Sequence, residues 1–223
     1  MSIAQNIKAL RDRIPANVRL IAVSKTQPVE IVQKAYDAGH RIFGENRVQE
    51  LTAKYEALPK DIEWHLIGHL QSNKVKYIAP FVHLIHSVDS LKLLQEINRQ
   101  AKRNDRIIAC LLQIHIAREE TKFGFSPDEL QNLIAQTDWN SLANVEVIGL
   151  MGMATFTDDQ EVVRQEFRGL KRLFDDVAAG ALPRNVRMQE LSMGMSGDYH
   201  IAVEEGSTMV RVGTAIFGNR NSK

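Results

Sequence analysis

Short apolar runs alternate with longer amphipathic segments from about residue 18 to the end of this 223-residue chain. The short runs have the length of strands, whereas the longer segments repeat apolar residues at helical spacing, as at Leu91, Leu94 and Ile97. Strands that alternate with helices are typical of a parallel sheet covered by helices. The pattern predicts eight strands, at residues 18–23, 41–44, 63–68, 83–88, 107–115, 145–151, 190–192 and 209–212.

Eight such units in a chain of this length predict a single (β/α)8 TIM barrel that occupies residues 1–223 as one domain. An open doubly wound α/β sheet is the alternative, which periodicity alone does not exclude. The first strand-to-helix turn, residues 24–28, contains no glycine, so it does not resemble a dinucleotide-binding turn. Residues 2–13 predict an extra helix before the first strand.

Two later helices have recognisable starts. Ser126 and Glu129, with Pro127 between them, form a candidate capping box. Thr157 and Gln160 form a second candidate.

Composition excludes several functional classes. The 28 Lys and Arg residues nearly balance the 27 Asp and Glu residues, so no global field favours nucleic acid or an anionic membrane. We expect no membrane segment and no signal peptide, because apolar runs of the required length are missing. The single cysteine, Cys110, lies in an apolar run and is expected in the core. Together these features predict a cytoplasmic protein.

Lys25 is the first candidate for chemistry. It follows an apolar strand-like run and precedes the turn-forming Pro28, which places its amine where a buried strand meets a loop. Burial against hydrocarbon disfavours the charged form of lysine and lowers its pKa. A neutral amine can form an imine with an aldehyde or ketone, although a strand-end lysine can also simply extend to water.

Two loops that follow the last predicted strands are rich in small residues. They are residues 191–198, which include Ser192 and Gly194, and residues 210–215, which include Gly213 and Thr214. Barrel enzymes commonly bind phosphate in the loops after strands seven and eight. Glycine lets backbone amides approach an anion, and hydroxyl groups add donors. Together with Lys25, these loops predict a site for a phosphorylated carbonyl compound.

Two kinds of ligand fit that description. One is a sugar phosphate, as in a lysine-dependent aldolase, and the other is pyridoxal 5'-phosphate (PLP) bound as an imine. Arg211, near the end of the last strand, favours PLP because a guanidinium can donate to the pyridine nitrogen while opposing its protonation. An ion pair with a carboxylate is the alternative role for Arg211.

Five segments together resemble the signature blocks of the PLP homeostasis protein family. In chain order they are 22–26 (AVSKT), 43–50 (FGENRVQE), 64–74 (WHLIGHLQSNK), 191–196 (LSMGMS) and 211–218 (RVGTAIFG). The resemblance covers nearly the whole chain. It implies the barrel of the fold-type III PLP enzymes, which is related to the N-terminal domain of alanine racemase.

The resemblance also implies roles for individual residues. Lys25 corresponds to the lysine that forms the PLP Schiff base, and Arg211 to the partner of the pyridine nitrogen. Asn46 corresponds to a residue near the ring, with Ser196 and His69 as further rim residues. The positions around the phosphate are Ser192, Gly194, Gly213 and Thr214.

The implied function is intracellular PLP (vitamin B6) homeostasis, with effects on amino-acid and keto-acid balance and little or no catalytic turnover. A racemase needs a second acid or base from another domain, and this sequence ends soon after its eighth strand. The same consideration predicts a monomer. Because a carrier must hand on its cofactor, apo-PLP enzymes are the expected recipients. The alternative is a PLP-dependent enzyme, a weak racemase or lyase, on an unidentified amino acid.

We predict no metal site. His65 and His69 are four residues apart, but they straddle a predicted strand end, and the sequence indicates no further ligands for a metal ion. His83, His86 and His115 are expected as packed or hydrogen-bonded strand residues.

Overall fold

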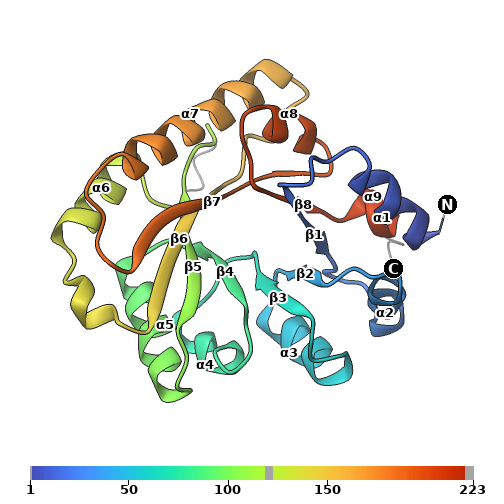
Figure 1. The fold of residues 1–223 in the computed structure, drawn as a ribbon, viewed down its shortest axis with the longest axis horizontal. Coiled ribbons are helices and arrows are strands. Elements are labelled where there is room, and N and C mark those ends of the chain that lie inside the picture. Colours follow the sequence, from blue (N-terminus) through green and yellow to red (C-terminus); the bar gives the residue numbers. More distant parts are fainter. Residues whose placement is uncertain (1, 119–122, 219–223) are drawn as a thin grey trace.

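The computed structural model describes residues 2–118 and 123–218, and in this part of the chain eight parallel strands close into a barrel. Each strand pairs with the next in sequence order, and β1 pairs with β8. Helices surround the strands (Figure 1). The predicted (β/α)8 fold is therefore confirmed, and the open sheet is excluded. The strands are β1 Arg19–Val23, β2 Ile42–Glu45, β3 Glu63–Leu66, β4 Leu84–Val88, β5 Ile108–Ile114, β6 Val145–Gly152, β7 Val186–Met195 and β8 Met209–Val212.

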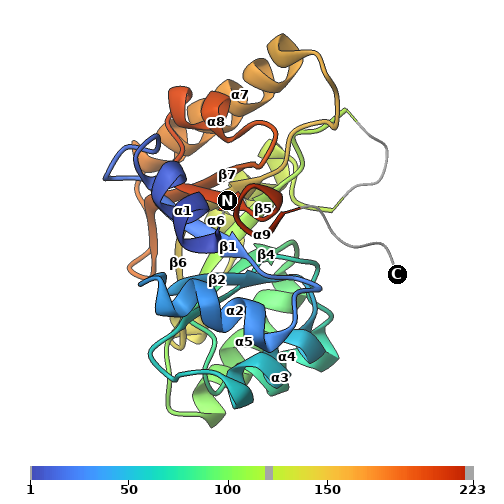
Figure 2. The ribbon, with the colours of Figure 1, turned by 90° about the vertical axis from the view of Figure 1, so that its right-hand side faces the viewer.

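The predicted extra helix is α1, which lies beside α9 in both ribbon views (Figures 1 and 2). Ile7 and Leu10 are its buried residues. In the described part of the chain, no helix is both long and apolar enough to cross a membrane. The helices are α1 Ile3–Arg11, α2 Val29–Asp37, α3 Val48–Ala57, α4 Val75–Ile78, α5 Leu91–Arg103, α6 Pro127–Gln136, α7 Gln160–Ala178, α8 Tyr199–Glu204 and α9 Thr214–Phe217, with 3-10 turns at Ser72–Lys74 and Trp139–Leu142.

Apolar side chains form two layers of core. The larger layer lies between the strands and the helices and includes Cys110, whose thiol pKa is raised by burial. The smaller layer is a separate cluster of strand residues, Ile21, Leu84, Leu111, Ile148, Met151 and Met209. The strands also carry polar side chains that are almost completely buried, and these include Glu45, His65, His86, Ser192 and Arg211.

The predicted boundaries of the seventh strand are wrong. The prediction was residues 190–192, followed by a loop, but β7 continues to Met195. Gly194 adopts a φ of +96°, and the register between β7 and β8 shifts between Ser192 and Met195. A small-residue sequence that reads as a loop is therefore an irregular strand, which places Ser192 inside the barrel wall.

The helix starts agree with prediction in one case and not in the other. Ser126 accepts a hydrogen bond from the backbone N–H of Glu129, whose side chain accepts from the backbone N–H of Ser126, so the capping box is confirmed. At α7 the N-cap is Asp159, not Thr157. The Asp159 carboxylate accepts hydrogen bonds from two backbone N–H groups of the first turn. Aspartate is also preferred over threonine as an N-cap residue.

We expect Ser126→Ala to lower the free energy of unfolding by about 1 kcal/mol, because an N–H at the start of α6 loses its acceptor. Urea denaturation measures this change. Ser126→Gly is the matched control and should cost only a few tenths of a kcal/mol, since glycine is tolerated at an N-cap. Equal losses in the two variants would argue against the capping role.

Candidate functional site

A cavity of about 540 Å³ lies at the carboxyl ends of several strands. Five of the seven residues predicted for the cofactor site line it, namely Lys25, Asn46, Arg211, Gly213 and Thr214. Ser196, predicted at the rim, also lines it. The barrel therefore brings together predicted residues from near both ends of the sequence, such as Lys25 and Thr214.

Lys25 lies in the turn between β1 and α2 and is partly buried. The turn is closed by a 3.0 Å hydrogen bond from the Gln27 N–H to the Ser24 carbonyl oxygen. The next residue, Thr26, has a φ of +65°, which is unusual for a β-branched residue. Its N–H donates to Oε2 of Glu50 at 2.7 Å, and this bond holds the unfavourable conformation in place.

A buried polar cluster supports the turn from below. The ammonium of Lys54 donates to Oε1 of Glu45 at 2.6 Å and to the Ser24 carbonyl oxygen at 2.7 Å. The Ser24 hydroxyl donates to the same Glu45 oxygen at 2.6 Å. Burial raises the pKa of Glu45, while Lys54 and Ser24 act in the opposite direction. The backbone on both sides of Lys25 is thus fixed by carboxylates and an ammonium from β2 and α3.

These positioning residues were not identified from the sequence as functional residues. A charged Glu45 at the end of an otherwise apolar strand was the available signal, because a carboxylate there needs a buried partner. Glu50 and Lys54 have the four-residue spacing of a helical ion pair, and their charged atoms are 3.6 Å apart.

Arg211 lies in β8 at the inner end of the cavity and is 3% exposed. Its guanidinium donates to the Ser192 hydroxyl at 2.5 Å and to the Gly152 carbonyl oxygen at 3.1 Å. Burial lowers the pKa of Arg211 to about 10, and the nearby Asp198 acts in the opposite direction. The group is therefore still a cation at neutral pH, and the hydrogen bonds fix its orientation.

The last two loops meet at Gly213. Its N–H donates to the Ser196 hydroxyl at 3.2 Å, which ties the loop after β8 to the loop after β7. A Cβ at Gly213 would lie 3.1 Å from the Val23 carbonyl oxygen, so the close approach of this loop to β1 favours glycine. Thr214 follows directly and adds a hydroxyl to the cavity wall.

Two predicted phosphate residues are not part of the cavity lining, and these are Ser192 and Gly194. Ser192 is completely buried, where its hydroxyl contacts both Arg211 and Nδ1 of His86. A Cβ at Gly194 would lie 2.5 Å from the Cβ of Ala202, so glycine at this position allows α8 to pack against β7. Their predicted contacts with a phosphate stay a prediction.

Asn46 has a side-chain oxygen without a hydrogen-bond donor in the described part of the chain. Its Oδ1 is buried and has no hydrogen-bond partner within residues 2–118 and 123–218. A buried amide oxygen without a partner is costly, which indicates a ligand donor or a water molecule at this point of the wall. The backbone of Asn46 packs closely against Gly68. A Cβ at residue 68 would lie 2.4 Å from the Asn46 carbonyl oxygen, so glycine is needed for this approach.

Apolar side chains stand at the edge of the cavity. Met153 and Met195 are 41% and 38% exposed, and Phe156 is 97% exposed. His69, the other predicted rim residue, does not line the cavity. Its ring lies 4.7 Å from that of Phe123, and its Nδ1 lies 3.3 Å from Oδ2 of Asp89.

Comparison with known families gives one match over almost the whole chain. The family model described as "Alanine racemase, N-terminal domain" matches residues 1–221. The pyridoxal phosphate homeostasis protein of Aquifex aeolicus is 44% identical over 203 residues, which cover 91% of this chain and 87% of that protein.

Solved structures give the same result. PipY of Synechococcus elongatus is 38% identical, and the match covers 97% of this chain and all of PipY. Its TM-score is 0.91 for the structure without PLP and 0.88 for the structure with PLP bound. Alanine racemase of Clostridium difficile has a TM-score of 0.77 at 14% identity. This match covers 58% of the longer racemase chain and shows a shared fold.

Proposed function

The chain belongs to the pyridoxal phosphate homeostasis protein family, and we propose that it binds PLP in the cavity that Lys25 and Arg211 share. The observation that carries the proposal is this pairing of an amine with a buried cation on the wall of one cavity. A relative that is 38% identical over 97% of the chain has been solved with PLP bound. The cavity also has the size typical of a cofactor site, about 300–1,000 Å³.

The residues present fit that cofactor. The Lys25 amine can condense with the PLP aldehyde, so that a C=N bond forms and one water molecule is released. Thr214 offers a hydroxyl donor to the phosphate, and the predicted roles of Gly213, Ser192 and Gly194 there are part of the proposal. Oδ1 of Asn46, which has no partner among the described residues, and the fixed guanidinium of Arg211 add polar groups to the wall of the same cavity.

Within the proposal, binding and release of PLP are the function, with little or no turnover. Support comes from Arg211, which stays cationic at neutral pH and is locked by two hydrogen bonds. A cation at the pyridine nitrogen disfavours protonation of the ring, and an unprotonated ring withdraws electrons weakly. The expected role is therefore PLP homeostasis, with effects on amino-acid and keto-acid balance.

We further propose that the chain is one PLP-binding domain, that it acts as a cytoplasmic monomer, and that apo-PLP enzymes receive its cofactor. The exposed side chains of Met153, Phe156 and Met195 support a recipient protein, because apolar groups at a cavity mouth are typical of contact surfaces. Release of PLP that accelerates with the concentration of an apo-enzyme would support direct transfer. A rate independent of that concentration would contradict it.

We expect Thr214→Val to weaken PLP binding by about 10–100-fold, since a hydrogen bond to a charged group is worth about 1.5–3 kcal/mol. Absorbance titration of the protein with PLP measures the dissociation constant. Thr137→Val, at the far end of α6, is the control and should bind PLP like the unchanged protein. If the unchanged protein fails to bind PLP, the proposed function is wrong.

A further inference from the structure

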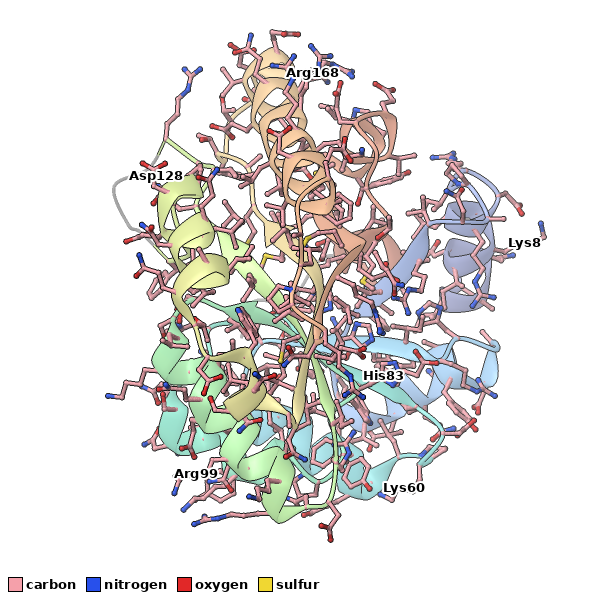
Figure 3. All side chains as sticks on the ribbon, turned by 60° about the vertical axis from the view of Figure 1, so that its left-hand side comes forward. Lys8, Lys60, His83, Arg99, Asp128 and Arg168 are labelled. Carbon is pink, nitrogen blue, oxygen red and sulfur yellow. The ribbon has the colours of Figure 1, made fainter. Side chains whose placement is uncertain are left out.

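Three potential ligands meet at the end of the barrel opposite to Lys25. Glu63 and His65 are the first and third residues of β3, and His83 directly precedes β4. Because the strands are parallel, their amino-terminal ends share one face of the barrel, whereas Lys25 follows the carboxyl end of β1. Figure 3 labels His83, which lies away from the outline of the molecule in that view, and its side chain is 51% exposed.

The distances between the ligand atoms of these three residues fit a shared metal ion better than direct hydrogen bonds. One ligand atom of each of the three residues lies within 4.8 Å of those of the other two. His83 Nε2 and Glu63 Oε2 are 3.5 Å apart, which is longer than an ordinary hydrogen bond. Two ligands at about 2.0–2.1 Å from a tetrahedral Zn²⁺ are separated by about 3.4 Å.

His65 provides the second, independent observation. It is completely buried, and its Nε2 has no hydrogen-bond partner among the described residues. Its other nitrogen, Nδ1, lies 2.9 Å from Nε2 of His86.

The hydrogen bonds behind His65 are those of a metal ligand. If Nε2 binds an ion, the ring proton lies on Nδ1 and is donated to His86. His86 in turn contacts the Ser192 hydroxyl at 2.9 Å through its Nδ1. A histidine ligand usually donates its second ring N–H to a neighbouring acceptor, which fixes its tautomer and ring orientation.

The nearby charges also permit a cation. Arg19, a cation whose charge reaches His65, forms an ion pair with Glu190 at 2.5 Å. Glu190 also accepts from the Thr208 hydroxyl. The three ligands are then one carboxylate, from Glu63, and two imidazoles. This ligand set suits Zn²⁺ and related ions better than Ca²⁺ or Mg²⁺.

We propose that Glu63, His65 and His83 bind a divalent transition-metal ion of the Zn²⁺ class, with water in the fourth position. The spacing of His65 and His69 in the sequence does not reveal this site. Two ligands belong to β3 and the third directly precedes β4, and the pairing of these strands sets His65 opposite Leu84, the residue after His83.

Calorimetric titration of the metal-free protein with ZnCl₂, in the absence of PLP, tests the site. We expect one ion per chain, and affinities more than about 100-fold lower for His83→Ala and Glu63→Gln, since even partners behind a ligand contribute about 10–100-fold. Both side chains are about half exposed, at 51% and 40%, so the variants should fold, which circular dichroism verifies.

His69→Ala is the matched control. His69 also faces a carboxylate, Asp89 at 3.3 Å, but it belongs to no three-ligand cluster in the described residues. We expect this variant to bind Zn²⁺ like the unchanged protein, and Co²⁺ to give a visible absorption that His83→Ala lacks. No binding, or equal binding in all four proteins, would overturn the site. Because PLP is absent, these outcomes are separate from the proposed function.

Discussion

Lys25→Ala will be colourless after incubation with PLP and dialysis, whereas the unchanged protein will be yellow and show the absorbance band of an imine. Alanine has no amine, so no C=N bond can form, and PLP is then held by non-covalent contacts alone. We expect complete loss of the band and release of PLP during dialysis. Absorbance spectra before and after borohydride reduction measure both effects.

Lys34→Ala is the control for this experiment. Lys34 is an exposed lysine on α2, the helix that follows the Lys25 turn, and it does not line the cavity. Its replacement should leave the band unchanged. A Lys25→Ala protein that keeps the band would show that another amine holds the cofactor.

Lys54→Met is expected to lower the free energy of unfolding by about 3–5 kcal/mol, because it leaves Glu45 buried without its cation. The Glu45 side chain is 0% exposed and that of Lys54 is 6% exposed, so water replaces little of the lost interaction. The Ser24 carbonyl oxygen also loses a donor, which should loosen the turn that carries Lys25. Urea denaturation at pH 8 measures the loss.

The loss should depend on pH. Burial already raises the pKa of Glu45, and removal of the ammonium raises it further. A carboxyl with a higher pKa in the folded state than in the unfolded state binds a proton on folding, so its penalty is present at high pH. The penalty decreases as the pH falls through the folded-state pKa. We therefore expect a smaller difference between variant and unchanged protein at pH 5.5 than at pH 8.

Two controls separate this effect from a general loss of lysine. Lys54→Met combined with Glu45→Gln should recover part of the stability, because no charge is then left buried. Lys8→Met removes an exposed ion pair, with side chains 77% and 60% exposed, and should have no measurable effect. An equally large loss in the double variant, unaffected by pH, would contradict the role assigned to Glu45.

The barrel was predictable from the sequence because its signal is local. A buried strand needs a short apolar run, and a covering helix needs one apolar face, so each unit is visible within about 11–18 residues. The place of Lys25 at the cavity was predictable for the same reason, since it lies two residues after the end of β1. The segment with Gly213 and Thr214 could also be predicted to leave the barrel wall, because β8 ends where the apolar run of the sequence ends.

Features that depend on pairing between strands were not predictable in this way. The true length of β7 and the buried position of Ser192 follow from a register shift against β8 and a left-handed Gly194. The cluster of Glu63, His65 and His83 arises because β3 pairs with β4, and the contact between Lys54 and Glu45 arises because α3 packs against β2. No local pattern in one sequence contains that information.

The position of the bound cofactor is tested most directly by peptide mapping. The protein is loaded with PLP, reduced with borohydride, digested and analysed by mass spectrometry. We expect the pyridoxyl phosphate mass on the peptide that contains Lys25 and on no other. A fully loaded protein whose Lys25 is unmodified, or whose label lies on a different lysine, would contradict the assignment of this amine as the PLP site.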